Sequence, residues 1–248
     1  MKVFLVSAAL GWSLLHAQSV PRLPGGAPDL GGKGIWYPRH VGDMAATKWK
    51  GEKSAEHDIE VPFLPWAKAK FDENRARGRN ETPDHCLPPG VPRMIFTPEP
   101  FQIVQEPKRI IFLYEGGAHV WRFVWMDGRS HPKEPNPSWM GDSIGHWEGV
   151  TLVVDAVGFN DKTWLDDAGH PHTEQLHVIE RYTRTSPVSM KYQVTIDDPG
   201  AYSKQWSSSA AIPFVPGEAL QEYICLEGER DTRRALPSRK LRLLSPID

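Results

Sequence analysis

The sequence predicts a mainly β protein, an antiparallel meander that closes into a barrel or folds as a sandwich. Three observations lead to this prediction. From about residue 101 onward, apolar and polar side chains alternate with a period of two, as in half-buried strands. Short turns containing Gly or Pro separate these stretches. The first 100 residues lack the alternation, so we expect an irregular N-terminal region with one short helix.

The alternating stretches define the order of the expected strands. They lie at 102–105, 109–115, 119–126, 146–147, 151–159, 176–184, 190–196 and 220–226. Gly116-Gly117, Glu148-Gly149 and Ser186-Pro187 supply short turns between neighbours. Two longer loops, 127–141 and 160–174, interrupt the meander, and long loops are where binding and catalytic residues concentrate.

The N-terminal region contains a strand signal and a helix signal. Gly34-Ile35-Trp36 starts a first short strand. The helix runs from Pro65, which suits a first helical turn, to Arg77, and Gly78 ends it. We therefore expect a single domain over 19–248, in which 19–100 wraps around a β core at 101–226.

The first 18 residues have the pattern of a secretory signal peptide. Lys2 provides an early positive charge, an apolar run follows, and Ala17 is a small residue at the expected cleavage point. The run is too short to span a bilayer, and no other segment could span one. The alternative is a short N-terminal element of the fold. We expect a secreted or periplasmic protein.

Composition narrows the class of partner. A formal net charge of −2 with no basic patch argues against nucleic acid. Ten Trp and 23 Pro suit irregular loops held by aromatic anchors, and they suit a carbohydrate or aromatic small molecule as ligand. The alternative is that most of the Trp side chains belong to the core.

Two cysteines, Cys86 and Cys225, are the only ones in the chain. In an oxidising compartment we expect them to form one disulfide that ties the N-terminal region to the last strand. Closing so long a loop adds on the order of 4 kcal/mol in the chain-entropy model. Two buried free thiols are the alternative.

Three charged residues sit on otherwise apolar strand faces. Arg122, Asp155 and Glu180 each alternate with apolar neighbours at a spacing of two. A buried charge without a partner costs several kcal/mol, so we expect the three to meet inside the barrel. They form either a structural ion-pair network or part of a ligand site, in which Arg122 orients an anion and Glu180 acts as an acid or base.

The loop 160–177 is the most chemically suggestive segment. His170, His172 and Glu174 are spaced two residues apart, so an extended chain could aim them at one divalent metal such as zinc. His177 has the opposite parity and joins them only if the chain bends. Without a metal, a His–carboxylate pair such as His172 with Asp166 could perform acid–base chemistry.

Two further residues complete the predicted catalytic set. They are Asp161, in the same loop, and His131, which is also a distant candidate ligand. The alternative is a solvated polar loop whose histidines are satisfied by hydrogen bonds. Other templates are missing from the sequence, namely GxSxG, the P-loop, GxGxxG, HExxH and the glutamate spacing of the cupin motif.

Several long motifs resemble a large family of exported, β-rich bacterial proteins that is numerous in soil Acidobacteria. They are SIGHWEGVTLVVDAVGFNDKTW at 143–164, CLPPGVPR at 86–93 and TIDDP at 195–199. Val150 departs from the usual acidic residue and His146 from the usual Arg. Because the family is largely uncharacterised, the resemblance implies export and a β-rich fold but no mechanism. Gly34-Ile35-Trp36 also resembles the GxW of lipocalin-type barrels.

Three functional hypotheses remain open at this point. The first is an exported hydrolase or lyase, metal-assisted or not, that acts on a small molecule at a His/carboxylate loop at the barrel mouth. The second is a lipocalin-like binding protein for an apolar or aromatic ligand. The third is a structural module of the cell envelope. The sequence favours the first and identifies no substrate.

Overall fold

The computed structural model describes residues 20–78 and 86–223. The predicted signal peptide, at 1–18, and Cys225 lie outside the described residues. No cysteine in the described part of the chain is free, and the pairing with Cys225 stays a prediction. In the described ranges no helix is long and apolar enough to cross a membrane.

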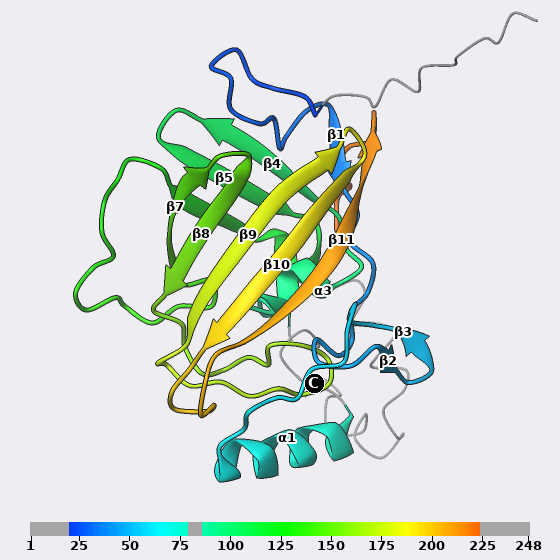
Figure 1. Cartoon of the computed structure of the whole chain (residues 1–248), viewed down its shortest axis with the longest axis vertical. Helices are drawn as coiled ribbons and strands as arrows, with labels where there is room; N and C mark the ends of the chain where they lie inside the picture. The colour runs from blue at the N-terminus through cyan, green and yellow to red at the C-terminus, as the bar shows by residue number, and fades with distance from the viewer. Residues whose placement is uncertain (1–19, 79–85, 224–248) are drawn as a thin grey trace, which may run out of the picture.

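Nine strands form a closed barrel, so the prediction of a mainly β barrel is confirmed (Figure 1). They are β1 (Gly34–Trp36), β4 (Phe101–Glu106), β5 (Arg109–Tyr114), β6 (Trp121–Trp125), β7 (Asp142–Glu148), β8 (Thr151–Val157), β9 (His177–Ser186), β10 (Ser189–Asp197) and β11 (Trp206–Pro216). Consecutive strands are neighbours from β4 to β11, and β1 closes the barrel by pairing with both β11 and β4.

One junction breaks the expected antiparallel pattern. β6 and β7 run parallel and share a single pairing position, Trp125 with Ile144. The connection at 126–141 carries the chain back to the end of the barrel where β6 began, so β7 starts in the same direction. All other neighbouring strands are antiparallel, and the barrel is therefore mixed.

The last strand was placed wrongly by the sequence pattern. We expected it at 220–226, of which 220–223 form no strand and 224–226 lie outside the described residues. The last strand of the barrel is instead β11, Trp206–Pro216, which pairs with β10 from Trp206 opposite Ile196 to Pro213 opposite Ser189. Its stretch Ser207-Ser208-Ser209-Ala210-Ala211 has no apolar alternation and low strand propensity. Pairing with β10 on one side and β1 on the other overrides that weak local preference.

Helices and a small hairpin complete the structure. They are α1 (Pro65–Arg77), α3 (Arg93–Phe96), α4 (Gly116–His119) and the hairpin of β2 (Lys48–Trp49) with β3 (Glu52–Lys53). The predicted helix is confirmed as α1, which ends at Gly78 with a positive φ of 72°. In Figure 1, α1, the β2–β3 hairpin and several loops form a layer below one end of the barrel.

The barrel interior is filled by the protein's own side chains. Aromatic residues from four strands, Phe101, Phe112, Tyr182 and Tyr192, are completely buried. Their rings contact one another at centroid distances such as 5.2 Å for Phe112 with Tyr182 and 5.0 Å for Tyr182 with Tyr192. α3 closes the lower end, where Phe96 packs against Tyr192. This packing argues against the lipocalin-like hypothesis, which requires an open interior.

Candidate functional site

The charged residues inside the barrel form a hydrogen-bonded network, in which one buried nitrogen, Arg122 Nη2, has no partner. Arg122 Nη1 donates to Glu180 Oε2 at 2.5 Å, and Arg122 Nε donates to Ser143 Oγ at 2.9 Å. Glu180 Oε1 accepts hydrogen bonds from the hydroxyls of Tyr182 at 2.7 Å and Tyr192 at 2.9 Å. The pKa of each tyrosine is raised well above the ordinary value, mainly by burial and next by the charge of Glu180. Both hydroxyls therefore keep their protons and act as hydrogen-bond donors.

The predicted meeting of Arg122 and Glu180 is therefore correct, and the inclusion of Asp155 is wrong. Asp155 lies on the outer face of β8, because Leu152, Val154 and Ala156 take the inward positions and are completely buried. Both faces of this strand are apolar in sequence, so the pattern did not reveal which face points inward.

Asp155 belongs instead to a chain of four side chains on the outside of the barrel. His131 Nδ1 bonds Asp142 Oδ1 at 2.6 Å, and His131 Nε2 faces Asp155 Oδ1 at 3.1 Å. His177 Nε2 bonds the same Asp155 oxygen at 2.7 Å. All four side chains are partly exposed. His131, a predicted catalytic residue, thus lies between two carboxylates on the barrel surface.

The metal set predicted in the loop is not assembled. His172 is buried and bonds Thr163 Oγ1 through Nε2 at 2.7 Å, while its Nδ1 lies 3.1 Å from the Thr173 carbonyl oxygen. Glu174 and Asp161 are exposed, and His177 points to the outer chain. Burial lowers the pKa of His172, which favours the neutral imidazole. The spacing of two residues did not bring these ligands together, because each side chain finds a different partner.

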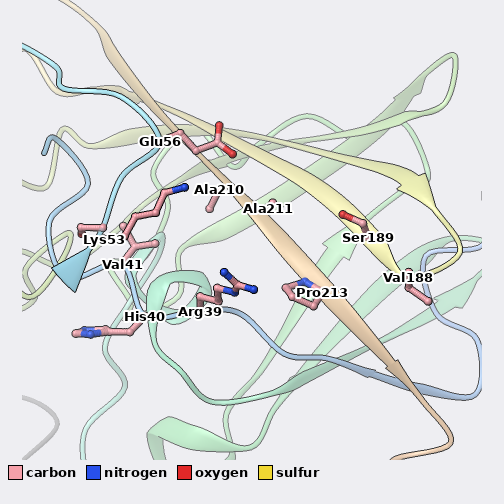
Figure 2. Close-up of a pocket in the computed structure, with 11 residues that line it drawn as sticks. Arg39, His40, Val41, Lys53, Glu56, Val188, Ser189, Ala210, Ala211 and Pro213 are labelled. Atoms are coloured by element: carbon pink, nitrogen blue, oxygen red, sulfur yellow. The ribbon is translucent and has the colours of Figure 1, made fainter. Parts of the chain in front are cut away.

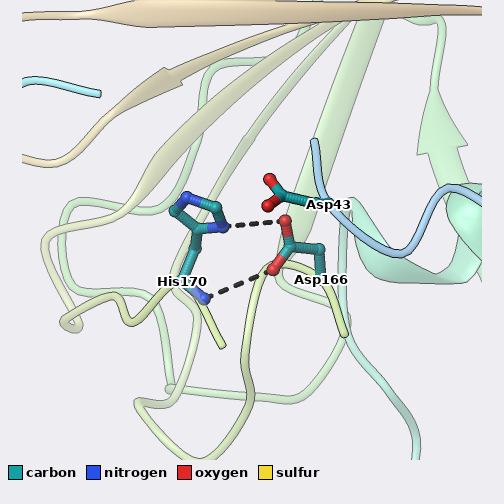
Figure 3. A group of neighbouring side chains, drawn as sticks. All are labelled: Asp43, Asp166 and His170. Atoms are coloured by element: carbon teal, nitrogen blue, oxygen red, sulfur yellow. Dashed lines mark hydrogen bonds and ion pairs between the residues drawn. The ribbon is translucent and has the colours of Figure 1, made fainter. Parts of the chain in front are cut away.

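His170 meets a different pair of ligands, Asp43 and Asp166, in what we call the Asp–Asp–His cluster (Figure 3). Asp166 Oδ2 accepts hydrogen bonds from His170 Nδ1 at 2.7 Å and from the Met44 amide at 2.8 Å. Its Oδ1 accepts the amides of Gly169 at 3.1 Å and His170 at 3.3 Å. The three residues of the cluster, backbone included, are at most 2% exposed.

Aromatic rings fix the orientation of His170. The imidazole stacks on Phe63 at a centroid distance of 5.6 Å and an interplanar angle of 3°. Phe71 of α1 lies 4.5 Å away and Trp206 of β11 lies 5.4 Å away, both measured between ring centroids. Elements distant in sequence therefore hold the ring so that Nδ1 faces the carboxylates.

The cluster is rich in negative charge. Burial, and then the charge of Asp166, raises the pKa of Asp43, while His170 and Arg75 act in the opposite direction. Asp43 Oδ1 accepts the Ala45 amide at 2.9 Å, and its Oδ2 lies 3.4 Å from Arg75 Nη1. Asp43 comes from the irregular N-terminal region, and no local pattern distinguishes it from other aspartates, so sequence reasoning missed it.

Asp167, the next residue after Asp166, points the other way. It bonds His40 Nε2 at 2.6 Å and forms a short ion pair with Arg93. Burial opposes ionisation of Asp167, but the hydrogen bond from His40 and the Arg93 charge prevail and lower its pKa. A neighbouring pocket has a volume of about 360 Å³. Figure 2 shows that Arg39 and Lys53 point towards it, while the His40 ring points away.

These features define a class of protein, a closed mixed β-barrel with a filled, charge-paired interior and a buried Asp–Asp–His cluster in the layer beneath it. Comparison with known proteins adds no more specific identity. No family model, no curated protein and no solved structure matches the chain.

Proposed function

We propose that the protein is an exported metal-binding β-barrel protein that takes one divalent cation of the zinc class at Asp43, Asp166 and His170. The observation that carries the proposal is the convergence of three ligand atoms, one from each residue, which lie within 4.8 Å of one another in a buried site. Two carboxylates and one imidazole form a ligand set typical of zinc, manganese or iron.

The charge balance of the cluster supports a cation. The pKa of Asp43 is raised first by burial and then by the charge of Asp166, while one imidazole and a contact to Arg75 at 3.4 Å oppose the rise. A divalent ion would take the place of the proton that His170 Nδ1 shares with Asp166 Oδ2. Binding would weaken as the pH falls, because protons compete with the ion for the imidazole and the carboxylates.

The burial of the cluster favours a structural role for the ion. A catalytic metal keeps one coordination position open to substrate or water, whereas a structural metal is enclosed. Asp43, Asp166 and His170 are all almost fully buried. An ion here would fasten the N-terminal segment around Asp43 to the loop 166–170 and so stabilise the layer below the barrel.

Arg75 marks the side on which the cluster comes nearest to solvent. Its side chain is half-exposed, whereas that of Asp43 is 3% exposed. The guanidinium and an incoming cation would compete for the same Asp43 oxygen. We therefore expect Arg75→Ala to bind the cation more tightly than the wild type does, by removing the competing charge.

The test is a titration of the metal-free protein with Zn²⁺ and Mn²⁺ by calorimetry, with the bound metal counted after dialysis. We expect one ion per chain, and a stabilisation of about 2.7 kcal/mol at a free ion concentration one hundred times Kd. Asp43→Asn and His170→Ala should abolish binding. His146→Ala and Glu174→Gln, at exposed positions outside the cluster, are the matched controls and should bind normally.

Two outcomes would refute the metal proposal. One is a wild-type protein that binds no ion at micromolar concentration while its thermal unfolding shows an intact fold. The other is an Asp43→Asn variant that binds as tightly as the wild type, because a site without Asp43 is not the cluster described above.

A second candidate function, hydrolase or lyase chemistry, is supported by the outer chain of His131, Asp142, Asp155 and His177. A histidine held between carboxylates suits proton transfer. The His131 ring occupies the space between Asp142 and Asp155, so these two carboxylates are not placed to flank a glycosidic bond. Loss of turnover in His131→Ala with unchanged ligand affinity would support catalysis, and unchanged turnover would exclude this site.

A further inference from the structure

The outer face of β6 carries a line of exposed aromatic side chains. Trp121, Phe123 and Trp125 alternate along the strand and point away from the interior, which Arg122 and Val124 face. Trp121 is 59% exposed and Phe123 36% exposed. The rings of Phe123 and Trp125 are 6.0 Å apart between centroids. We call these three residues the aromatic stripe. Large exposed apolar features of this kind mark binding sites.

The strand next to β6 supports the stripe from one side. Leu113, Ile111 and Arg109 of β5 lie opposite Trp121, Phe123 and Trp125, respectively. The guanidinium of Arg109 lies 5.1 Å from the centroid of the Phe123 ring. On the loop after β6, Arg129 stacks over Trp125 at 3.9 Å. The rings are thus held in place before any ligand arrives.

A groove runs along the other side of the stripe. β6 and β7 pair only at Trp125 and Ile144, so the barrel wall opens between the rest of β6 and the start of β7. This opening holds a pocket of about 220 Å³. Its lining comprises Trp121, Arg122, Phe123, Trp125, Met140, Gly141, Asp142 and Ser143. On the interior side of the barrel wall, the hydrogen bond from Arg122 of β6 to Ser143 of β7 links the two strands.

We infer that the aromatic stripe and this groove bind an extended, uncharged oligosaccharide. A sugar ring offers a face of C–H groups that stacks on an aromatic ring and an edge of hydroxyls that bond to carboxylates. Asp142 provides such a carboxylate in the groove, partly exposed and oriented by His131 at 2.6 Å. An apolar surface with a few fixed polar groups is the usual composition of a ligand site.

The charges around the stripe indicate a neutral ligand. Arg129 is paired with Asp127 at 2.6 Å, and Arg109 is paired with Glu106 at 2.5 Å. These pairs leave little net charge to attract an anionic lipid surface or a nucleic acid. The rings follow one another along the strand, which suits an extended chain, and the 50° tilt between Phe123 and Trp125 means that each ring would stack on a separate sugar.

The test is titration of the purified protein with cellohexaose and chitohexaose, followed by tryptophan fluorescence and calorimetry. We expect Trp121→Ala to weaken binding at least tenfold, in line with the loss of one stacking contact. Asp142→Asn should weaken it several-fold. Trp66→Ala is the matched control, since Trp66 is 46% exposed on α1, away from the stripe, and its loss should leave the affinity unchanged.

Three outcomes would overturn the inference. The first is that neither oligosaccharide binds at millimolar concentration. The second is that Trp66→Ala weakens binding as much as Trp121→Ala does. The third is a dimer in light scattering that dissociates in Trp121→Ala, which would make the stripe a contact between two copies. The oligosaccharide site shares no residue with the Asp–Asp–His cluster, so binding in the presence of a chelator separates failure of this inference from failure of the metal proposal.

Discussion

The barrel interior and the layer beneath it both bury charged residues, but they balance the charge differently. In the interior, Arg122 neutralises Glu180, Ser143 accepts a further hydrogen bond from Arg122, and two tyrosine hydroxyls donate to Glu180. In the layer beneath, Asp43 and Asp166 share one imidazole, with Arg75 at a longer distance. The charges of the first network balance within the chain, although Arg122 Nη2 has no hydrogen-bond partner, whereas the second has an excess of negative charge.

The difference shows why one buried cluster suggests a ligand and the other does not. A buried pair of one positive and one negative charge is neutral as a whole, so it needs no further ion to balance its charge. When two carboxylates lie in one buried site, the charge of each disfavours ionisation of the other. A bound cation lowers the free-energy cost of keeping both ionised. The charge balance of a buried cluster is therefore a better guide to a metal site than the spacing of histidines in the sequence.

The largest expected effect comes from breaking the balanced pair in the interior. Glu180→Gln leaves the buried Arg122 without its counter-charge and should lower the free energy of unfolding by about 3–5 kcal/mol. Urea denaturation measures this change. The matched control is Glu148→Gln, which removes an exposed ion pair with Arg181 and should change the free energy of unfolding very little. Equal losses in the two variants would contradict a special role for burial.

The next largest effect comes from the carboxylate at the centre of the Asp–Asp–His cluster. Asp166→Asn disturbs an acceptor of four hydrogen bonds and should cost about 2–3 kcal/mol in the metal-free protein. Denaturation with and without Zn²⁺ measures the change, and the variant should show no stabilisation by the ion. If Zn²⁺ stabilises Asp166→Asn as much as the wild type, the cluster is not the metal site.

A smaller effect concerns the pH dependence that His172 contributes. Its pKa is lowered by burial, so the unfolded chain binds a proton more readily than the folded chain does. The stabilising contribution is therefore complete above the unfolded pKa of about 6.5 and is lost as the pH falls through the lower folded value. His172→Asn should show a shallower loss of stability between pH 6.5 and pH 5. An unchanged slope would mean that the pKa of His172 is the same in the folded and unfolded states.

The smallest effect has the opposite sign and tests the excess charge directly. The folded pKa of Asp43 is raised, so its ionisation destabilises the metal-free protein as the pH rises through that value. Asp43→Asn removes this charge. It should raise the free energy of unfolding of the metal-free protein at neutral pH, by an amount at the low end of about 0.5–2 kcal/mol. Thermal unfolding in a chelator measures it. A clear destabilisation would show that Asp43 acts mainly as a hydrogen-bond acceptor for Ala45.

Much of the fold was predictable because alternation is a local property of the chain. The strands β4, β5, β9 and β10 and the helix α1 appear close to their predicted positions. β11 was missed because its Ser and Ala residues carry no alternation, and the inward face of β8 was misjudged because both of its faces are apolar. In both cases the neighbouring strands supply the information that the segment lacks.

The candidate site was predictable only in part, for a related reason. His170 and Asp166 stand four residues apart in one loop, and the sequence suggested both. Their third partner, Asp43, is more than one hundred residues away in a region without a regular pattern. His172, Glu174 and His177 had suitable spacing, but hydrogen bonds, exposure and strand geometry send them elsewhere.

The sequence by itself determined the strand-rich composition of the chain, the amphipathic alternation and the segment in which reactive side chains gather, because each depends on residues close together in the chain. Only the tertiary structure decided that the barrel closes through β1, that β6 and β7 separate beside the aromatic stripe, and that Asp43 joins Asp166 and His170. These outcomes depend on which distant segments pack together, and local side-chain patterns do not encode that pairing.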